Sequence, residues 1–513
     1  MSIVTIALPP GMMRNGTYYD AKDRWHDGNR VRWHNGAMRA IGGWIRARKF
    51  DDTDLDPLTN DPDQTIFRDG FSWIDNGGSR YRIFGGNDEL KLWAADDSIV
   101  DITPAGFVGT PAAPTISTGY GTWLYNRFPY GAARPINPVD TPGIYRWSFD
   151  TYGENVICGP SSPIFRGSLY QWDVDIGVGT PATIIPNAPT DVNNFVVTDQ
   201  RIIMTIGSSV DQRLVRWSDR ENITGWTPTQ QNYAGDYFLQ GTGRLLSIDK
   251  VLDQVLILSE TDAHIARWLG APLVYGFTRV GNDCGPWNSS VIYASDRLAM
   301  WPGRRTFWLY DGTLKQVQCE VMDFIAENID FSNIAKAFVI GIPQYTEIWW
   351  FFQSIGSSTG EVDMYVSYDY VENHWSKGAL DRTGGLNGEV YVNPYMIRGD
   401  DQVIFEHDRD DLVVNEAWCE TGPLEMGQGE QNMAVRYIYP DVETRGDVNF
   451  TLYGQNMPTD DRYVYGPYQF NNPIPTRALG RSLSMRVDGQ DVPNWKVGGK
   501  NRFDVAPMGT GTR

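Results

Sequence analysis

The chain has 513 residues, a formal net charge of −19 and a sequence pI near 4.7. Aromatic residues make up 13% of it, beside 53 glycines and 30 prolines, a composition that favours many short strands joined by tight turns over a helical protein. The acidic balance argues against a surface built to grip nucleic acid, which needs clustered Lys and Arg, and no apolar run is long enough to span a bilayer.

Residues 1–65 are expected to form an N-terminal unit whose charge differs from that of the rest. Nine basic and three acidic residues up to Phe50 give about +6 there, which leaves about −25 for the remainder. The segment from Arg24 to Gly36 alternates aromatic and basic residues, which predicts a hairpin that turns at Gly28-Asn29. We expect this basic arm to dock on an acidic partner or a neighbouring copy, and a solvated terminal segment is the alternative. The candidate docking residues are Arg24, Arg30, Arg32, Trp33 and Arg39.

An acidic stretch follows the basic arm. Its six aspartates are Asp51, Asp52, Asp54, Asp56, Asp61 and Asp63. Such a segment is not expected to bury itself, because unpaired carboxylates are costly to remove from water. It also lacks the turn glycine and the closing glutamate of an EF-hand loop, so a solvated loop is favoured over a calcium site.

From residue 66 to residue 412, short strands recur that end in an aromatic residue followed by an Asp-led turn. The clearest copies are Trp217-Ser-Asp219, Tyr310-Asp311 and Tyr368-Asp369. Repeats of roughly 40 to 60 residues with three or four strands each are typical of a β-propeller. The predicted fold is therefore all-β, with a propeller-like domain of about six or seven blades. The Pro- and Gly-rich residues 103–142 predict an inserted loop within it.

The predicted strands of this domain group into seven units in chain order. The units begin near Phe71, Ile144, Phe195, Leu245, Val291, Ala337 and Val390, and the seventh is expected to run from Val390 to Glu406. Apolar residues from Val317 to Ile329 switch to helical spacing and predict one short helix before the sixth unit. We expect each aromatic residue to fill the interior of its blade and each aspartate to turn the chain. Longer alternating strands over residues 413–513 predict a C-terminal β-sandwich or outer sheet.

A search for catalytic and metal-binding motifs finds no specific match. The nearest likeness to the Asp-box of sialidases, Ser367 to Val371, lacks the glycine, and no pair of carboxylates can be singled out for glycoside hydrolysis. His26 and His34 lie among arginines that would repel a metal ion. The cysteines Cys158, Cys284, Cys319 and Cys419 form no CxxC pair and are expected to be reduced core residues. We therefore predict that the chain is not an enzyme and holds no cofactor or metal.

Three groups of residues resemble one protein family. They are Pro9-Pro-Gly-Met-Met-Arg-Asn-Gly16 with Trp25 to Trp33 and Ile41-Gly-Gly-Trp44, Val215-Arg-Trp-Ser-Asp219 with Trp226-Thr-Pro228, and Trp495-Lys-Val-Gly-Gly499 with the residues up to Arg513. Together they are similar to the tail nozzle proteins of short-tailed bacteriophages, also described as tail tubular or packaged-DNA-stabilising proteins. The likeness spans nearly the whole chain.

The resemblance implies a structural virion protein that is assembled in the host cytoplasm. Six propeller-based copies would form the distal tail tube, below a ring of adaptor proteins and in company with tail fibre or spike proteins. The tube would retain packaged double-stranded DNA and let it pass at ejection. Receptor or glycan binding by a tail module, and less favourably a propeller-type polysaccharide depolymerase, are the alternatives.

The acidic charge has a physical use in such a tube. Six copies at −19 would carry about −114, and an acidic wall repels phosphate over about 8 Å at physiological salt. DNA could then slide through without sticking. We hypothesise that the Asp51 to Asp63 stretch or the 103–142 insertion faces the lumen as a gate, and that the basic arm contacts the adaptor or a neighbouring subunit.

Overall fold

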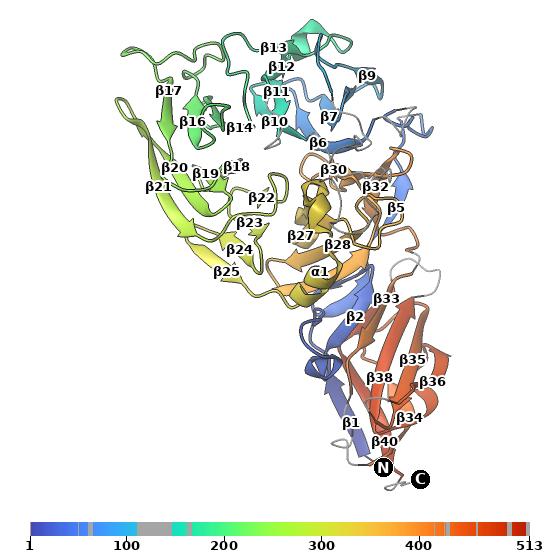
Figure 1. Ribbon diagram of the computed structural model, residues 1–513. Helices are drawn as coiled ribbons and strands as arrows, with labels where there is room; N and C mark the ends of the chain where they lie inside the picture. The colour runs from blue at the N-terminus through green and yellow to red at the C-terminus, as the bar shows by residue number, and fades with distance from the viewer. Residues whose placement is uncertain are drawn as a thin grey trace, which may run out of the picture.

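The computed structural model describes residues 2–49, 51–59, 65–109, 146–161, 167–414, 416–424, 426, 431–457, 460–489 and 495–508. Figure 1 shows two parts, a ring of small sheets and an elongated domain at which both termini lie. The regular elements of the described residues are almost all β-strands, with one α-helix, α1 (Met322–Asn328), after the fifth unit as predicted. Four short 3₁₀ helices, η1 (Tyr18–Ala21), η2 (Val174–Ile176), η3 (Phe331–Lys336) and η4 (Pro343–Tyr345), lie in connections. No helix in these ranges is long and apolar enough to cross a membrane.

Seven four-stranded antiparallel sheets form the ring, and the first six are consecutive in sequence. Blade 1 holds β6 (Phe67–Ile74), β7 (Arg80–Gly86), β8 (Leu90–Trp93) and β9 (Ile99–Asp101), and blade 2 holds β10 (Trp147–Tyr152), β11 (Asn155–Pro160), β12 (Tyr170–Trp172) and β13 (Thr183–Ile184). Blade 3 holds β14 (Asn194–Val197), β15 (Ile203–Ile206), β16 (Leu214–Trp217) and β17 (Gly235–Phe238), and blade 4 holds β18 (Leu245–Val251), β19 (Gln254–Ser259), β20 (Asp262–Gly270) and β21 (Val274–Asn282). Blade 5 holds β22 (Tyr293–Ala294), β23 (Ala299–Pro302), β24 (Phe307–Tyr310) and β25 (Leu314–Val317), and blade 6 holds β26 (Phe338–Ile342), β27 (Glu347–Phe352), β28 (Met364–Asp369) and β29 (His374–Ala379).

Blade 7 combines three strands from the end of the propeller with one from the N-terminus. It holds β30 (Gly384–Leu386), β31 (Tyr395–Ile397), β32 (Ile404–Arg409) and, on the outer edge, β5 (Gly43–Arg46). Ile45 of β5 pairs with Glu406 of β32. The first strands of neighbouring blades contact one another all the way round, from β6 to β30 and back to β6. The all-β prediction with a propeller of six or seven blades is confirmed, and the number of blades is seven.

Blade 7 differs from its predicted outline. Residues 390–393, expected to be its first strand, are not a strand, and residues 384–386 take that place. Residues 43–46, which include Trp44, supply the fourth strand. The pairing joins residues from the two ends of the propeller, so no local pattern could indicate it.

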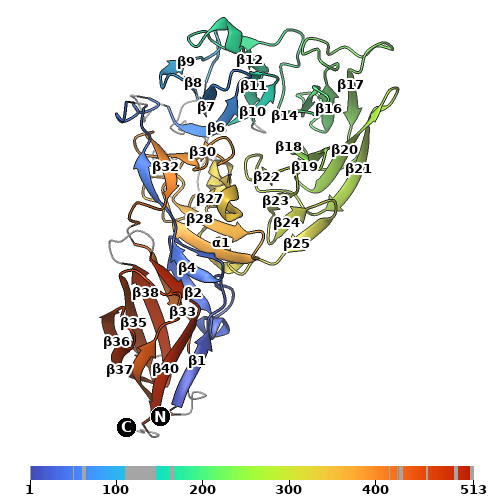
Figure 2. The ribbon, with the colours of Figure 1, turned by 180° about the vertical axis from the view of Figure 1, so that it is seen from behind.

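The second part is a β-sandwich built from both ends of the chain. One sheet holds β1 (Ser2–Ala7), β40 (Lys500–Pro507), β34 (Met433–Tyr439) and β37 (Ile474–Gly480), and the other holds β2 (Trp25–Asn29), β33 (Trp418–Thr421), β38 (Ser482–Gly489), β35 (Val448–Gln455) and β36 (Tyr463–Gln469). A three-stranded sheet of β3 (Val31–His34), β4 (Ala37–Ala40) and β39 (Lys496–Gly498) completes it. Val435 and Phe503 of the first sheet and Phe450 and Met485 of the second belong to one buried apolar cluster. Figure 2 shows the N-terminal strands lying beside the C-terminal ones.

The N-terminal residues therefore do not stand apart from the two β domains. Their hairpin also differs from the expected one, because it turns at Asn35-Gly36, where φ is +52° and +71°, between β3 and β4. Asn-Gly suits such a turn because both residues tolerate positive φ. Gly28, the expected turn residue, lies inside β2, where an added Cβ would come within 2.9 Å of the carbonyl oxygen of Trp418. Glycine at this position allows close packing against β33.

The aromatic-Asp repeat has the structural role expected from the sequence. Trp217, Tyr310 and Tyr368 are all buried. The Asp369 carboxylate accepts hydrogen bonds from the backbone N–H groups of Val371 and Glu372 at 2.8 Å, and Asp311 accepts one from Thr313 at 3.4 Å. Asp369 and Asp311 thus fix the turns after their strands. All four cysteines are buried and unpaired, as expected.

Candidate functional site

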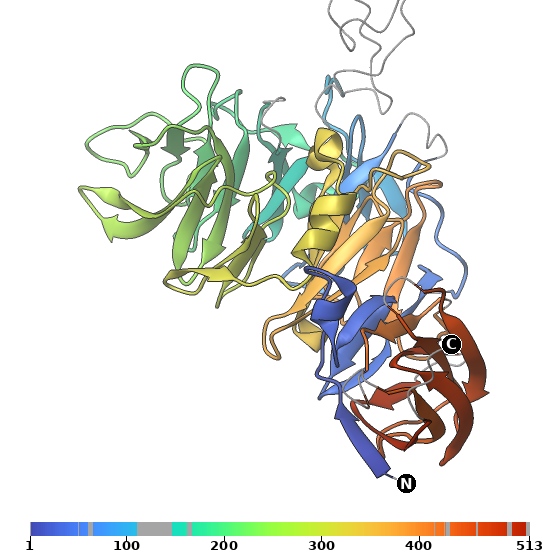
Figure 3. The ribbon, with the colours of Figure 1, turned by 60° about the horizontal axis from the view of Figure 1, so that its bottom comes forward.

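The N-terminal residues lie at the junction between sandwich and propeller. We call residues 12–42 the N-terminal brace. The Met12 N–H donates to the carbonyl of Trp375 at 2.8 Å, and the Arg14 N–H donates to that of Glu320 at 2.8 Å. Strands β2 and β3 both contact β29, the outer strand of blade 6 (Figure 3). The brace therefore connects the sandwich to the propeller along one side of the ring.

Arg32 is the buried charged centre of the brace. Its side chain is 1% exposed, and its guanidinium lies 2.8 Å from Asp408 of blade 7 and 3.1 Å from Glu347 of blade 6. The guanidinium also lies 4.0 Å from the centre of the Tyr345 ring. Burial opposes the charge of Arg32, but the two carboxylates outweigh it and raise its pKa. The network ties β3, β27 and β32 together.

Burial also opposes the charge of Glu347 in this network, and here it is the dominant effect. It raises the pKa of the carboxyl to about 7, although the neighbouring Arg32 favours the charged form. The indole N–H of Trp349 donates to this carboxylate at 2.8 Å. One guanidinium faces two carboxylates here, so the two acids compete for a single positive charge.

Two further predicted docking residues also contact the chain's own propeller. The Arg24 guanidinium donates to both carboxylate oxygens of Glu320, at 2.6 and 2.7 Å. The Arg30 Nε donates to the carbonyl of Ala379 at 3.0 Å. Both arginines thus donate hydrogen bonds to oxygen atoms of residues that are distant in the sequence.

The remaining docking candidates lie inside the same junction. Trp33 is buried, and the guanidinium of Arg39 lies 4.6 Å from the centre of the Tyr345 ring. Arg32 and Trp33 have no surface to offer a second protein. The docking predicted from the charge pattern therefore takes place within this chain for Arg32 and Trp33. Arg32 pairs with Glu347 of blade 6 and Asp408 of blade 7, and Trp33 packs against His374 of blade 6.

The acidic stretch is described only in part. Asp52 pairs with Arg48 at 2.8 Å and Asp56 with Lys49 at 3.1 Å, while Asp51 and Asp54 are exposed as well. Asp61 and Asp63 lie outside the described residues, as does the predicted insertion from residue 110 onward. The stretch was expected not to bury itself, yet it is anchored, because Leu55 and Leu58 pack in a buried cluster that spans blades 1 and 7.

The first strands of all seven blades line a central cavity of about 800 Å³. Lys250 of β18 lies 3.3 Å from the carboxylate of Asp150 of β10. Burial raises the pKa of Asp150, and burial together with the charge of Asp150 raises that of Asp249 to about 7. A cavity of this size suits a small molecule and not a DNA duplex. The sequence predicted strands near Asp150 and Lys250 but did not single out these residues. They line the same cavity only because closure of the ring brings β10 and β18 together.

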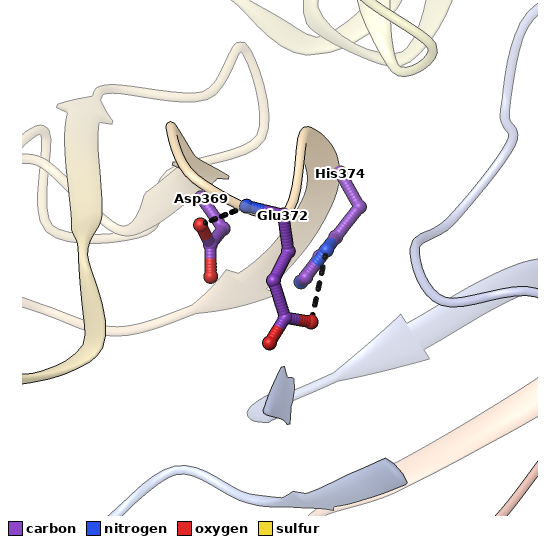
Figure 4. A group of neighbouring side chains, drawn as sticks. All are labelled: Asp369, Glu372 and His374. Atoms are coloured by element: carbon purple, nitrogen blue, oxygen red, sulfur yellow. Dashed lines mark hydrogen bonds and ion pairs between the residues drawn. The ribbon is translucent and has the colours of Figure 1, made fainter. Parts of the chain in front are cut away.

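One group of described residues has the spacing of a metal-ligand set. Asp369, Glu372 and His374 can each offer one ligand atom, and these atoms lie within 4.8 Å of one another (Figure 4). Burial lowers the pKa of His374, and this effect outweighs the nearby carboxylates and backbone carbonyls that raise it. Among the histidines, sequence reasoning tested only His26 and His34 as metal ligands. The signal that it passed over is the Asp-x-x-Glu-x-His spacing in the turn of the repeat.

Comparison with known proteins finds distant structural likenesses. No protein-family model and no curated protein matches the chain. Among solved structures, the WD40 domain of Neurospora crassa Pan2 is similar over 69% of this chain and 98% of its own, with 10% identity and a TM-score of 0.38. The AfRom2 CNH domain is similar over 66% and 93%, with 8% identity and a TM-score of 0.30. A fungal alcohol oxidase of the AA5 family, in complex with copper, is similar over 89% and 100%, with 11% identity and a TM-score of 0.40.

The alcohol oxidase overturns one prediction from the sequence. The absence of a motif led us to predict that the chain is not an enzyme, and this prediction was wrong as an exclusion, because an enzyme is among the similar structures. Catalytic residues on a ring of blades come from separate strands, so a search for local motifs does not exclude them. At 11% identity and a TM-score of 0.40, the likeness transfers neither the oxidase activity nor the copper site.

Proposed function

We propose that this protein is a structural virion protein of a short-tailed bacteriophage, where six copies form the distal nozzle of the tail tube. The nozzle retains packaged DNA and conducts it during ejection. The observation that carries the proposal is where two of the three family-like groups of residues lie; the third, around Trp217, lies in blade 3. Residues 12–16 and 25–33 belong to the brace, residues 41–44 lead into β5, and Lys496 of β39 pairs with Arg39 of β4. Segments from opposite ends of the chain thus converge on one junction.

A stiff junction suits the wall of a tube. Relative domain motion is the ordinary expectation for two domains in one chain unless their interface is extensive. Here the brace crosses the junction, and the pairs of Arg24 with Glu320 and of Arg32 with Asp408 fasten it to two separate places on the propeller. A ring of such subunits would keep its lumen open without hinge motion in each wall segment.

The charge distribution also supports the passage of DNA. The chain carries −19 overall, and the brace residues Arg24 and Arg32 are held in ion pairs within the chain. They therefore do not form a free phosphate-binding patch. We propose that the Asp51 to Asp63 stretch or the 103–142 insertion faces the lumen as the gate, and the exposed carboxylates of Asp51 and Asp54 are suited to repel phosphate.

Electron microscopy of the purified virion tests the proposal. We expect six copies of the propeller and sandwich at the tail tip, below the adaptor ring. A position on a fibre or spike, in another symmetry, would contradict the nozzle and favour the receptor- or glycan-binding alternative. A map with the acidic stretch and the insertion both on the outer surface would refute the gate while leaving the nozzle in place. Clearance of host polysaccharide by the isolated chain would favour the depolymerase.

A further inference from the structure

The turn between β28 and β29 brings three side chains with metal-binding atoms into one small volume. Asp369 ends β28, His374 begins β29 and Glu372 lies in the turn between them. Figure 4 shows the three side chains grouped around the turn, with the Glu372 carboxylate between the other two. Carboxylate oxygen and imidazole nitrogen are ligands that divalent transition metals accept.

The buried histidine distinguishes this turn from an ordinary acidic one. His374 is 5% exposed, and its Nδ1 has no hydrogen-bond partner among the described residues. This atom faces the Glu372 carboxylate at 3.9 Å, which is too far for a hydrogen bond. Two ligand atoms that each lie about 2.0–2.2 Å from a Zn²⁺ ion are separated by roughly 3 to 4 Å. A buried polar atom without a partner is costly, and a bound ion would remove that cost.

The carboxylates of Asp369 and Glu372 are oriented by hydrogen bonds. In each carboxylate these bonds are made to one of the two oxygens. Oδ1 of Asp369 accepts the N–H groups of Val371 and Glu372 at 2.8 Å and the Thr346 hydroxyl at 3.0 Å. Oε1 of Glu372 accepts the N–H of Asn35 at 2.8 Å, and Oε2 is the oxygen nearest His374. Such supporting bonds hold ligands in place before an ion arrives.

We propose that Asp369, Glu372 and His374 bind one divalent transition-metal ion of the Zn²⁺ type, with water in the remaining positions. The imidazole ligand favours this class over Mg²⁺ and Ca²⁺, which prefer oxygen ligands throughout. Glu372 holds Asn35 of the brace, and the His374 ring packs 6.0 Å from that of Trp33. The ion would therefore fasten blade 6 to the brace. This site is independent of the proposed nozzle function.

Blade 5 offers a matched control turn. Asp311 follows Tyr310 as Asp369 follows Tyr368, and its carboxylate accepts the hydroxyl and N–H of Thr313. Its charged partner is Lys315. Asp311→Asn alters a turn of the same kind and removes none of the proposed ligands.

Titration calorimetry of the metal-stripped full chain with ZnCl₂ tests the site. We expect one equivalent of Zn²⁺ per chain, a higher thermal unfolding midpoint at saturation, and no such rise with Mg²⁺ at the same concentration. Glu372→Gln keeps an acceptor for Asn35 but removes the charge, so affinity should fall at least about tenfold, and His374→Asn should lower it further. Asp311→Asn should bind Zn²⁺ as the unaltered chain does.

Two results would overturn the proposal. One is the lack of stoichiometric Zn²⁺ binding by the unaltered chain, and the other is unchanged binding in Glu372→Gln. If His374→Asn fails to fold, Glu372→Gln decides alone, because the Glu372 side chain is 26% exposed and its replacement preserves the brace contact. Visible absorption of bound Co²⁺, lost in the same variant, would be a second readout of the same ligand set.

Discussion

Blades 6 and 7 and blades 3 and 4 are built from the same four-stranded unit, but they differ in what covers their outer strands. The outer strand of blade 6 contacts strands of the brace, and the outer strand of blade 7 is β5 itself. In blade 3 the outer strand exposes Tyr237 and Phe238, and Leu273 beside the outer strand of blade 4 is also exposed. One side of the ring is thus used to close the fold, while the other side presents an uncovered edge.

The ion pairs of the two sides differ in burial. On the braced side Arg32 is buried between two carboxylates, whereas at blade 4 Arg244 lies 2.6 Å from Glu260 with the two side chains 39% and 42% exposed. Breaking a buried pair leaves uncompensated charge in the interior, whereas an exposed pair contributes little. The comparison predicts that stability is concentrated on the braced side.

Arg32→Ala should have the largest effect. It leaves Asp408 and Glu347 buried without their cation, so the free energy of unfolding should fall by about 3–5 kcal/mol. Urea unfolding at pH 7 measures it, with Arg244→Ala as the control at less than about 1 kcal/mol, because its pair with Glu260 is exposed on both sides. Equal losses in the two variants would remove the distinction between the sides.

Asp249→Asn should change how stability depends on pH. The pKa of Asp249 is raised from 3.8 to about 7 in the folded chain, so the unfolded chain loses this proton first as the pH rises. This group therefore makes the free energy of unfolding fall between about pH 4 and pH 7. The variant should be more stable than the unaltered chain at pH 8, by on the order of 2–4 kcal/mol, and the difference should vanish near pH 3. Unfolding across that pH range measures the difference, with Asp52→Asn as an exposed control. Parallel curves for Asp249→Asn and the unaltered chain would mean that the pKa of Asp249 is not raised.

Arg24→Ala should have a smaller effect than these two. Its bidentate pair with Glu320 is 26% exposed on both sides, so water can replace part of what is lost. We expect a loss of about 1 kcal/mol. A double-mutant cycle with Glu320→Gln should give a coupling energy of similar size, and a coupling near zero would mean that the pair does not fasten the brace.

Leu273→Ser should have the smallest effect. This residue is 70% exposed beside the uncovered edge of blade 4, so the free energy of unfolding should change by less than about 0.5 kcal/mol. Urea unfolding measures it. A loss above about 1.5 kcal/mol would mean that the uncovered side contributes to stability as the braced side does.

The sequence predicted what local patterns encode. The Tyr310-Asp311 turn, the strands around it and helix α1 follow from alternation, turn residues and helical spacing. Pairing of β5 with β32 could not be predicted in this way, because a strand of four residues shows nothing of its partner at the other end of the propeller. For the same reason the basic residues of the brace suggested an external partner.

The candidate sites show the same limit. Asp150 and Lys250 become neighbours only when the ring closes, although each lies in a strand expected from the sequence. His374 follows shortly after Tyr368-Asp369 of the repeat, but its buried and unpartnered Nδ1 depends on how the brace packs over the turn.

Native-state hydrogen exchange most directly tests whether the brace joins propeller and sandwich into one rigid body. The amides of Met12, Arg14 and Asn35 donate hydrogen bonds across the junction. They should exchange as slowly as the amides of β27 and β28 in the core of blade 6, because opening them requires the junction to unfold. Exchange as fast as that of the exposed edge strand β17 would contradict a rigid junction.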